Sequence, residues 1–368
     1  MKPSAITLVL VMLIYLPGCS QHNFTDMLSS GEVMRLKVPS SASTGTYAAL
    51  EDHYLFWSDT RAGSNRSCGL ETCNHNLFAL DLRTGEEITI ANTEFSDVNP
   101  IADDGYVVWE ERHPPLCRNY SDPACIRFFR IWRAPLANFS DKEVIYVSND
   151  SLLLNWKDYY DGLLVLEKYS PFNYNHVELV SLPSGDVTDL PIREPKPDPT
   201  HNAKTEAAIT QYGTIMLTKM SVWGGENVRD AVEYDIESGD FIDSDPPFSL
   251  SQWHILSRKR SEDGRMTFII REGENYHVWA YNLTSGDYEL LYETKNYIID
   301  PIVSGNILLY INREDAPQCD IYAYNLDTGE ERRITHLNQD LTNIYYDKPY
   351  LVFNNWKLVI MFMDWEWT

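Results

Sequence analysis

Basic residues are scarce in this sequence of 368 residues. Thirty Lys and Arg stand against 54 Asp and Glu, which gives a formal net charge of −24. Because a nucleic acid must be met by clustered cationic side chains, this balance excludes nucleic acid as a partner. A direct contact with anionic lipid head groups is disfavoured for the same reason.

Known catalytic motifs are also lacking. The sequence has no Gly-x-Ser-x-Gly, no His-Glu-x-x-His, no phosphate-binding loop and no EF-hand loop. The nine histidines form no i, i+2 or i+4 pair, and acid pairs such as Asp103-Asp104 are expected by chance among 54 acids. The sequence therefore predicts no catalytic residue, cofactor or metal centre, and it favours a binding protein over an enzyme.

The N-terminus has the features of an export signal. Lys2 precedes an apolar run from Ala5 to Leu16. Twelve helical residues rise only about 18 Å, which is short for a membrane span and typical of a signal peptide. The run ends in Leu16-Pro-Gly-Cys19, which resembles the lipobox of bacterial lipoproteins, although Pro17 departs from that pattern. The resemblance implies cleavage before Cys19 and acylation of its thiol. The alternative is an ordinary signal peptide with an incidental cysteine.

This interpretation gives three segments and a location. Residues 1–18 are the signal peptide, 19–31 a lipid-anchored linker, and 32–368 a single domain. The lipid would be the chain's only contact with the membrane. Ser20 resembles the residue found after the cysteine in outer-membrane lipoproteins of Gram-negative cells. The expected location is the cell envelope: the outer membrane in a Gram-negative cell, and otherwise the cell surface.

Export would place the other five cysteines in an oxidising compartment, where disulfides persist. Cys68 and Cys73 flank one short segment, Cys117 and Cys125 flank another, and both segments hold turn-forming residues. We therefore expect two local disulfides and an unpaired Cys319, although spacing alone does not fix the pairing. A metal site made of Cys68, Cys73 and His75 is an alternative that lacks the spacing of structural zinc sites.

A short phrase recurs along the chain. Its five copies are Asp81-Leu-Arg-Thr-Gly85, Ser181-Leu-Pro-Ser-Gly185, Asp235-Ile-Glu-Ser-Gly239, Asn282-Leu-Thr-Ser-Gly286 and Asn325-Leu-Asp-Thr-Gly329. Alternating apolar residues lie on both sides of each copy, so each phrase predicts the turn of a β-hairpin. The glycines are 100, 54, 47 and 43 residues apart, which indicates a repeat of about 50 residues with one degraded copy at 135–141.

A second phrase precedes the first in each repeat, as in Asn99-Pro-Ile-Ala-Asp-Asp-Gly105 and Asp300-Pro-Ile-Val-Ser-Gly305. Together they predict four strands per repeat, with repeats beginning near residues 47, 98, 152, 205, 252, 299 and 343. No segment keeps a helical apolar period for three turns. The sequence therefore predicts an all-β protein, a β-propeller of seven four-stranded blades. A misread boundary would make six or eight, and a pair of β-sandwiches is the alternative.

The last repeat contains only three strands, at 344–347, 351–355 and 358–364. The segment from Glu32 to Val38 is an unassigned strand that we expect to complete that blade. The two phrases together, Pro-Ile-x-x-x-Gly-x-x-x-x-Trp/Tyr and Ile-Tyr-Ala-Tyr-Asn-Leu-x-Thr-Gly-Glu, resemble the repeats of TolB-like β-propellers. The resemblance covers about residues 47–353 and implies a fold rather than an activity.

The loops between the second and third strands are long in repeats one and two, and we expect them on one face of the ring. With the loop of repeat six they carry all five remaining cysteines, so we expect a rigid binding surface there. Its expected residues are Asp59, Arg61, His75, Glu111, Arg112, His113, Arg313 and Asp315. The alternative is that the disulfides only protect surface loops from proteolysis.

The sequence thus predicts a lipid-anchored propeller that binds an envelope protein or a glycan. An enzyme acting on polysaccharide, a lyase or glycosidase, is the alternative, and a structural calcium ion among acidic loops is a further one. Six Asn-x-Ser/Thr sequons occur where roughly three are expected by chance, and they matter only in a cell that glycosylates exported proteins. They are Asn23, Asn65, Asn119, Asn138, Asn149 and Asn282.

Overall fold

A computed structural model provides the structure of this chain, and it describes the following residues: 33–35, 48–59, 75–113, 128–148, 153–169, 175–182, 184–190, 203–209, 214–221, 231–243, 254–260, 264–315, 318–336, 341, 343–354 and 358–363. Within these ranges the regular elements are all β-strands. The described residues contain no helix that could cross a membrane. The expected signal peptide, Cys19 and the linker 19–31 lie outside the described residues.

The described strands form seven four-stranded antiparallel sheets, which we number along the chain. The first holds β2 (Ala48–Glu51), β3 (Tyr54–Asp59), β4 (Asn76–Asp81) and β5 (Glu87–Ala91). The second holds β6 (Ser96–Asp103), β7 (Tyr106–Arg112), β8 (Phe129–Pro135) and β9 (Glu143–Ser148). The third holds β10 (Leu153–Tyr160), β11 (Leu163–Tyr169), β12 (Asn175–Ser181) and β13 (Asp186–Leu190).

The remaining sheets continue the same order of strands. The fourth holds β14 (Ala203–Ile209), β15 (Thr214–Ser221), β16 (Ala231–Asp235) and β17 (Phe241–Asp243). The fifth holds β18 (His254–Arg260), β19 (Arg265–Glu272), β20 (Asn275–Asn282) and β21 (Tyr288–Thr294). The sixth holds β22 (Ile298–Ser304), β23 (Ile307–Asp315), β24 (Gln318–Asn325) and β25 (Glu331–Arg333). The seventh holds β26 (Ile344–Asp347), β27 (Tyr350–Asn354), β28 (Leu358–Phe362) and β1 (Val33–Arg35).

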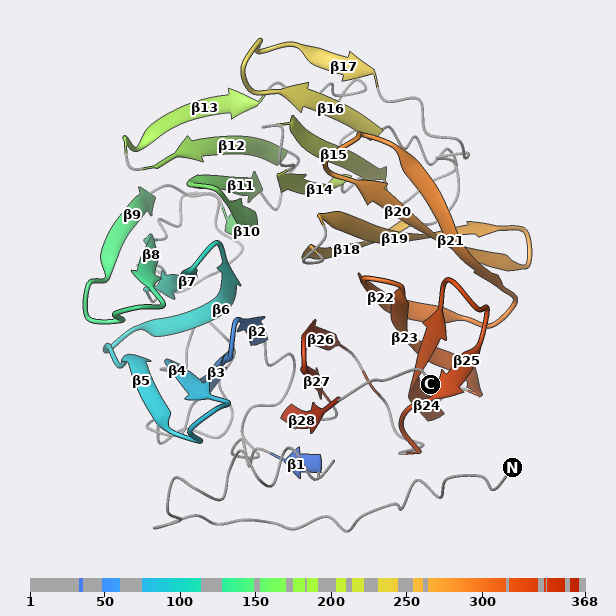
Figure 1. Cartoon of the computed structure of the whole chain (residues 1–368). Helices are drawn as coiled ribbons and strands as arrows, with labels where there is room; N and C mark the ends of the chain where they lie inside the picture. Colours follow the sequence, from blue (N-terminus) through green and yellow to red (C-terminus); the bar gives the residue numbers. More distant parts are fainter. Residues whose placement is uncertain are drawn as a thin grey trace.

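The sheets stand around a common centre, with the first strand of each sheet innermost and the fourth at the rim, as β14–β17 and β10–β13 show most clearly (Figure 1). This arrangement is a β-propeller, and each sheet is one blade. The seventh blade is completed by the N-terminal strand, because β1 pairs antiparallel with β28 from Val33↔Met361 to Arg35↔Val359. The expectation that the N-terminal strand joins the last blade is therefore confirmed.

The repeated phrase folds as predicted, with a polar side chain that caps the turn between the third and fourth strands. In the fifth blade Oδ1 of Asn282 accepts hydrogen bonds from the backbone N–H of Thr284 at 2.8 Å and of Ser285 at 3.1 Å. Gly286 follows at φ +73°, where residues with a side chain are strained, and its N–H donates to the carbonyl of Asn282 at 2.8 Å. Asp81, Asp235 and Asn325 make the same two backbone contacts in their own blades.

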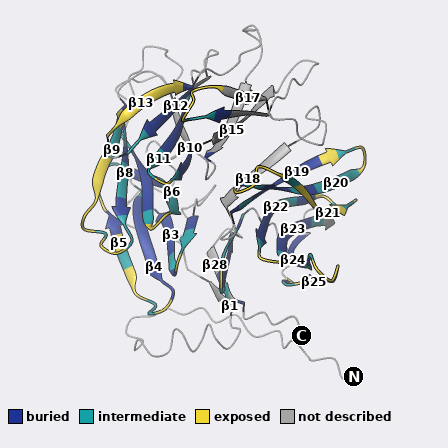
Figure 2. Cartoon of the chain, turned by 45° about the horizontal axis from the view of Figure 1, so that its top comes forward, coloured by how far each residue is buried: buried dark blue, intermediate teal, exposed yellow. Residues whose placement is uncertain are grey.

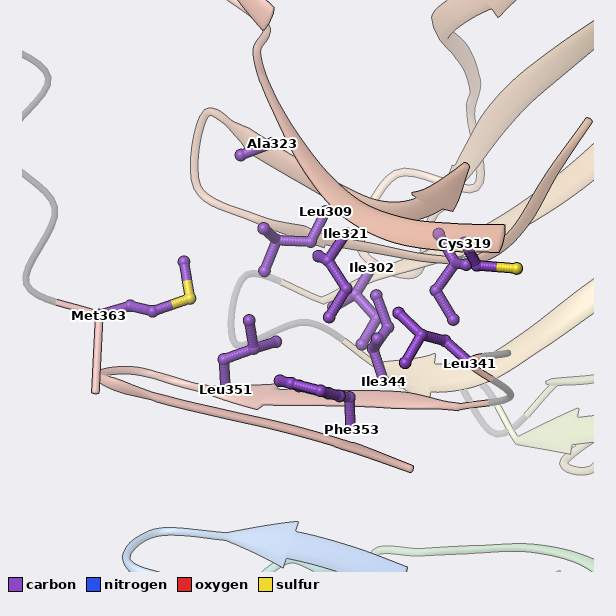
Figure 3. Close-up of a cluster of buried hydrophobic side chains, with 11 residues drawn as sticks. Ile302, Leu309, Cys319, Ile321, Ala323, Leu341, Ile344, Leu351, Phe353 and Met363 are labelled. Carbon is purple, nitrogen blue, oxygen red and sulfur yellow. The ribbon is translucent and has the colours of Figure 1, made fainter. Parts of the chain in front are cut away.

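The core of the protein lies between neighbouring blades. Figure 3 shows the layer between the sixth and seventh blades, where Leu309 and Ile321 face Leu351 and Phe353. Cys319 is a free thiol, as expected, but its expected place in the loop of the sixth repeat was wrong, because it lies in β24 and is buried in this layer. The rim differs, since β9 and β13 are exposed over much of their length (Figure 2). Apolar area is therefore removed from water mainly between blades, at roughly 25 cal/mol per Å².

Two carboxylates add hydrogen bonds between blades near the centre of the ring. Asp158 in β10 accepts from the backbone N–H of Ile209 in β14 at 2.7 Å. Asp300 in β22 accepts from the N–H of Ile344 in β26 at 2.5 Å. The innermost strands are thereby joined across the third and fourth blades and across the sixth and seventh.

The predicted repeat boundaries agree with the structure. The first strands of the blades begin at residues 48, 96, 153, 203, 254, 298 and 344. Each start lies within two residues of the expected one. The degraded phrase at 135–141 also forms the turn it was assigned, between β8 and β9.

The turn geometry generates a prediction at Gly286. A Cβ added there would lie 3.6 Å from the Tyr281 hydroxyl, an ordinary contact, so the cost of a side chain comes from the backbone conformation. We expect Gly286→Ala to lower the free energy of unfolding by about 1 kcal/mol, measured by urea denaturation. Gly286→Asn is the matched control and should lose clearly less, because Asn tolerates this conformation. Equal losses would show that the strain is not in the backbone.

Candidate functional site

The two long loops of the first and second blades leave the same face of the ring and share one foundation. The first loop follows β3 and ends before His75, and the second begins after His113 and ends before Phe128. Arg61 and the cysteines Cys68, Cys73, Cys117 and Cys125 fall in these loops, outside the described residues. We call the set His75, Phe95, Ser96, Glu111, His113 and Arg130 the loop base.

His75 fixes the end of the first loop to the second blade. Its ring Nδ1 lies 2.9 Å from the hydroxyl of Ser96, and its carbonyl accepts a hydrogen bond from the N–H of Asp97 at 2.8 Å. Ser96 and Asp97 begin β6, so the first loop returns directly onto the inner strand of the next blade. The end of the first loop therefore lies on β6, which pairs with β7, the strand that leads into the second loop.

His113 holds the start of the second loop. Its ring stacks on Phe95 with the centroids 3.5 Å apart, and it meets the edge of the Phe128 ring at 4.5 Å. Its Nε2 lies 2.7 Å from Oε1 of Glu111, and its backbone N–H donates to the carbonyl of Phe128 at 3.1 Å. Phe95 belongs to the linker between the first two blades, so this stack also ties the second loop to the first blade.

Glu111 is buried and has its hydrogen bonds satisfied by the protein. Besides His113, it accepts from Arg130 Nη1 at 3.1 Å and from the indole Nε1 of Trp132 at 3.2 Å. Trp132 stacks against Trp109, whose own indole N–H donates to Asp97 Oδ1 at 3.0 Å. Each of the two stacked indoles thus donates to a buried carboxylate. These hydrogen bonds fix the positions of Glu111 and Asp97 relative to the two tryptophans.

Asp97 is fully buried in this arrangement. The hydroxyl of Thr93 donates to its second oxygen at 3.0 Å, in addition to the Trp109 bond. Removal from water raises the pKa of Asp97 to about 6, and the nearby Glu111 charge adds to the rise, while the Thr93 and Trp109 hydrogen bonds oppose it. The carboxyl group of Asp97 therefore titrates in the mildly acidic range.

Glu110 and Arg112 lie on the other side of β7, toward the third blade, because side chains alternate along a strand. Glu110 has no exposed surface, and its Oε2 accepts from Arg112 Nη2 at 2.8 Å and from Asn99 Nδ2 at 3.0 Å. In the described part of the chain its Oε1 has no hydrogen-bond partner, and neither does Oδ1 of Asn99. Arg112 thus supports Glu110 and is mostly buried with it.

The other expected residues are placed as follows. Asp59 is buried and accepts from the indole N–H of Trp57 at 3.0 Å. Arg313 donates from Nη2 to the carbonyl of Leu341 at 3.3 Å, so it belongs to the junction of the sixth and seventh blades. Asp315 ends β23 with its backbone paired to Gln318, and its side chain is outside the described part. The structure therefore brings together His75, Glu111 and His113 but places Arg313 in another junction.

Sequence reasoning missed Phe95, Ser96 and Arg130 of the loop base, and it missed the buried residues that support the loop base: Asp97, Trp109 and Trp132. One signal was available, since an acid follows the tryptophan of the repeat by two residues in both Trp57-x-Asp59 and Trp109-x-Glu111. Such spacing puts the two side chains on the same side of a strand. The pairing of Phe95 with His113 has no comparable signal, because a linker residue carries no strand period.

Glu51, in the strand that begins the first blade, is a second carboxyl group with a raised pKa. Burial raises the pKa of Glu51 to about 7, and Asp103 of the second blade adds to the rise. Acids gather at these hairpins, and a structural calcium ion among acidic loops was one of the alternatives from the sequence. Among the described residues, no group of three or more His, Cys, Asp or Glu is arranged to hold a metal ion.

Comparisons with known proteins agree with this architecture. No protein-family model and no curated protein sequence matches the chain. A solved structure of an oligogalacturonate lyase in complex with manganese is similar, with a TM-score of 0.57 and 10% identity over 84% of this chain and 86% of that one. The β-propeller domain of the Trilobed protease from Pyrococcus furiosus has a TM-score of 0.54 and 10% identity, over 84% and 90%. The fold is a β-propeller.

TolB from Acinetobacter baumannii is also among the similar structures, with a TM-score of 0.40 and 9% identity over 96% of this chain and 86% of that one. At this level of similarity the match adds no argument to the resemblance of the repeats. The Pyrococcus furiosus domain is described as having an open velcro topology, whereas here β1 joins the last blade. These similarities establish the fold and leave the function to the site.

The raised pKa of Asp97 generates a prediction about pH. The folded-state pKa of about 6 lies above the usual 3.8, so the favourable contribution of this group is present below about pH 4 and is lost as the pH rises through 6. The difference corresponds to at most about 3 kcal/mol at neutral pH. We expect Asp97→Asn, which can keep both hydrogen bonds, to raise stability at pH 7 and leave it nearly unchanged at pH 4.

The measurement is the urea midpoint at several pH values between 4 and 7.5. Asp186→Asn, at the exposed first residue of β13, is the control and should not change the pH profile. A loss of stability at pH 7 in Asp97→Asn would show that the Trp109 indole and the Thr93 hydroxyl need a charged carboxylate as their acceptor.

Proposed function

We propose that the chain is a lipid-anchored propeller of the cell envelope that binds an envelope protein or a glycan through the loops of its first and second blades. The loop base is the observation that carries this proposal. Its members come from the first blade, the linker and the second blade, and they are joined at 2.7–2.9 Å through His75–Ser96 and His113–Glu111. Two loops built on one rigid foundation act as a single binding surface.

Rigidity at this position favours binding. Loops carry recognition when a rigid scaffold fixes their ends, because less conformational entropy is then lost in the complex. Glu111 meets three donors and cannot rearrange without leaving a buried charge unpaired, which costs several kcal/mol. Disulfides Cys68–Cys73 and Cys117–Cys125 are part of the proposal and would restrict the loops further.

The chemistry at the foot of the loops suits a partner with both rings and acceptors. Phe95, His113 and Phe128 are half-buried, and the Arg130 guanidinium lies 5.0 Å from the centre of the Phe128 ring. Aromatic rings of this kind pack against protein side chains or against the apolar face of a sugar, and the guanidinium donates to hydroxyl or carboxylate oxygens. The chain's negative charge excludes a polyanion as the partner.

The loops generate the first test of the proposal. Each loop is replaced separately by a short Gly-Ser linker, residues 61–74 in one variant and 114–127 in the other, so that the loop base is kept. Acylated protein is then used to capture partners from native envelope, and the bound partner is quantified by mass spectrometry. We expect both replacements to lower capture of the same partner by at least about tenfold, since one surface is divided between two loops.

Glu274→Gln, in the short turn of the fifth blade on the same face, and Asp287→Asn, on the opposite face, are the controls and should capture normally. Unchanged capture by both loop variants would overturn the proposed surface. A partner lost only on one replacement would restrict the surface to that blade.

The proposed anchor generates a second test. Cys19→Ser removes the thiol that would be acylated, and we expect the protein to move from the membrane pellet to the soluble extracytoplasmic fraction. A stable anchor needs two or more acyl chains, at about 0.8 kcal/mol per buried CH₂ group. Cys319→Ala is the matched control, because Cys319 is buried in the core and should not affect the anchor. Membrane retention of Cys19→Ser would contradict lipidation at this residue.

A further inference from the structure

Asn138 stands at the most accessible sequon that the structure describes. It lies in the turn between β8 and β9, where Asn138-Phe-Ser140 forms the pattern Asn-x-Ser. Both Asn138 and Ser140 are exposed. Oδ1 of Asn138 accepts a hydrogen bond from the N–H of Ser140 at 3.2 Å, and no described residue bonds to its Nδ2. The amide nitrogen therefore faces solvent beside the serine hydroxyl.

The middle residue of the sequon holds the turn in place. Phe139 packs into the layer between the first two blades, with its ring edge-on to Tyr54 at 5.2 Å and to Phe56 at 5.9 Å. The backbone closes around it, since the N–H of Asn138 donates to the carbonyl of Pro135 and the N–H of Asp141 to the carbonyl of Asn138, both at 3.1 Å. Because Phe139 is anchored inward, its two neighbours in the sequon are directed outward.

The other described sequon also has a buried middle residue, Leu283, but it differs in the exposure and the hydrogen bonds of its asparagine. Asn282 is half-buried, and its Oδ1 is used by two backbone donors at 2.8 and 3.1 Å in the turn of the fifth blade. A large group attached there would have to be accommodated around a turn that every well-kept repeat shares. Asn23, Asn65, Asn119 and Asn149 lie outside the described residues.

We propose that Asn138 is an N-glycosylation site of the exported protein. The donor is an oligosaccharide linked to a lipid phosphate. Nδ2 of Asn138 attacks the anomeric carbon of the first sugar, the bond from that carbon to the lipid phosphate breaks, and the lipid phosphate leaves with the electron pair. The amide gives up one proton, which is balanced by the charge of the leaving lipid phosphate that takes it up, so the product is an N-linked glycan and no oxidant or reductant is consumed. The inference rests on the proposed export of the chain.

The position of Asn138 is compatible with the proposed binding surface. The turn between the third and fourth strands leaves the face opposite the loops between the second and third strands, because successive strands of a blade are antiparallel. A glycan on Asn138 would therefore leave the loop base uncovered, and its removal should not reduce partner capture.

The test is peptide mapping of the full-length protein isolated from its own cells. Trypsin cuts after Arg133 and Lys142, so residues 134–142 form one peptide that contains this sequon alone. We expect most of this peptide to carry a mass increase made of sugar units, assigned by fragmentation to Asn138. Ser140→Ala keeps the backbone N–H that bonds to Asn138 but removes the hydroxyl of the motif, and it should abolish the modification. Ser140→Thr, the matched control, should retain it.

Two results would overturn the proposal: a 134–142 peptide that is unmodified throughout, or a sugar that persists in Ser140→Ala. The same map reports the N-terminal peptide, so failure here is distinguishable from failure of the proposed export. An acylated Cys19 with a bare Asn138 overturns only the glycosylation, whereas an uncleaved and unacylated N-terminus contradicts both.

Discussion

The structure depends on the need to remove both apolar faces of a sheet from water, as the described side chains of the second blade show. A single four-stranded sheet packed against one neighbour would leave the other face exposed. In the second blade Val107 and Trp109 pack toward the first blade, whereas Val108 and Ile131 pack toward the third. The ring arrangement gives each blade a neighbour on either side, and the pairing of β1 with β28 supplies the fourth strand of the last blade.

This constraint also explains why the buried acids stand where they do. Asp97 and Glu111 lie at the end of the layer between the first two blades, where the apolar packing gives way to the loops. There they hold the indole N–H groups of Trp109 and Trp132, which would otherwise be buried without an acceptor. Asp158 and Asp300 likewise accept hydrogen bonds from backbone N–H groups near the centre. The charges thus satisfy donors that the packing of the blades creates.

Most of the fold was predictable from the sequence, because its signals are local and repeated. A turn phrase such as Asn325-Leu-Asp-Thr-Gly329 encodes its own hairpin through side-chain-to-backbone bonds and one glycine, and it does so wherever it occurs. The site was predictable only in part. His75, Glu111 and His113 were identified from their position at long loops, but Phe95 and Ser96 enter through the approach of one blade to the next. Contacts of that kind have no period in the sequence. Arg313 shows the converse: an equivalent place in the repeat does not put a residue in the same junction.

The strand β1 also determines how the molecule would respond to a mechanical load. Among the described residues it is joined to the rest of the blade by three residue pairs, from Val33↔Met361 to Arg35↔Val359. A pull on the chain before Val33 therefore acts on this short ladder before it reaches any other strand. This ladder is the shortest in the seventh blade, because β26 and β27 share four described residue pairs and β27 and β28 share five. The strand that completes the seventh blade is thus also the strand that the fewest described residue pairs hold in that blade.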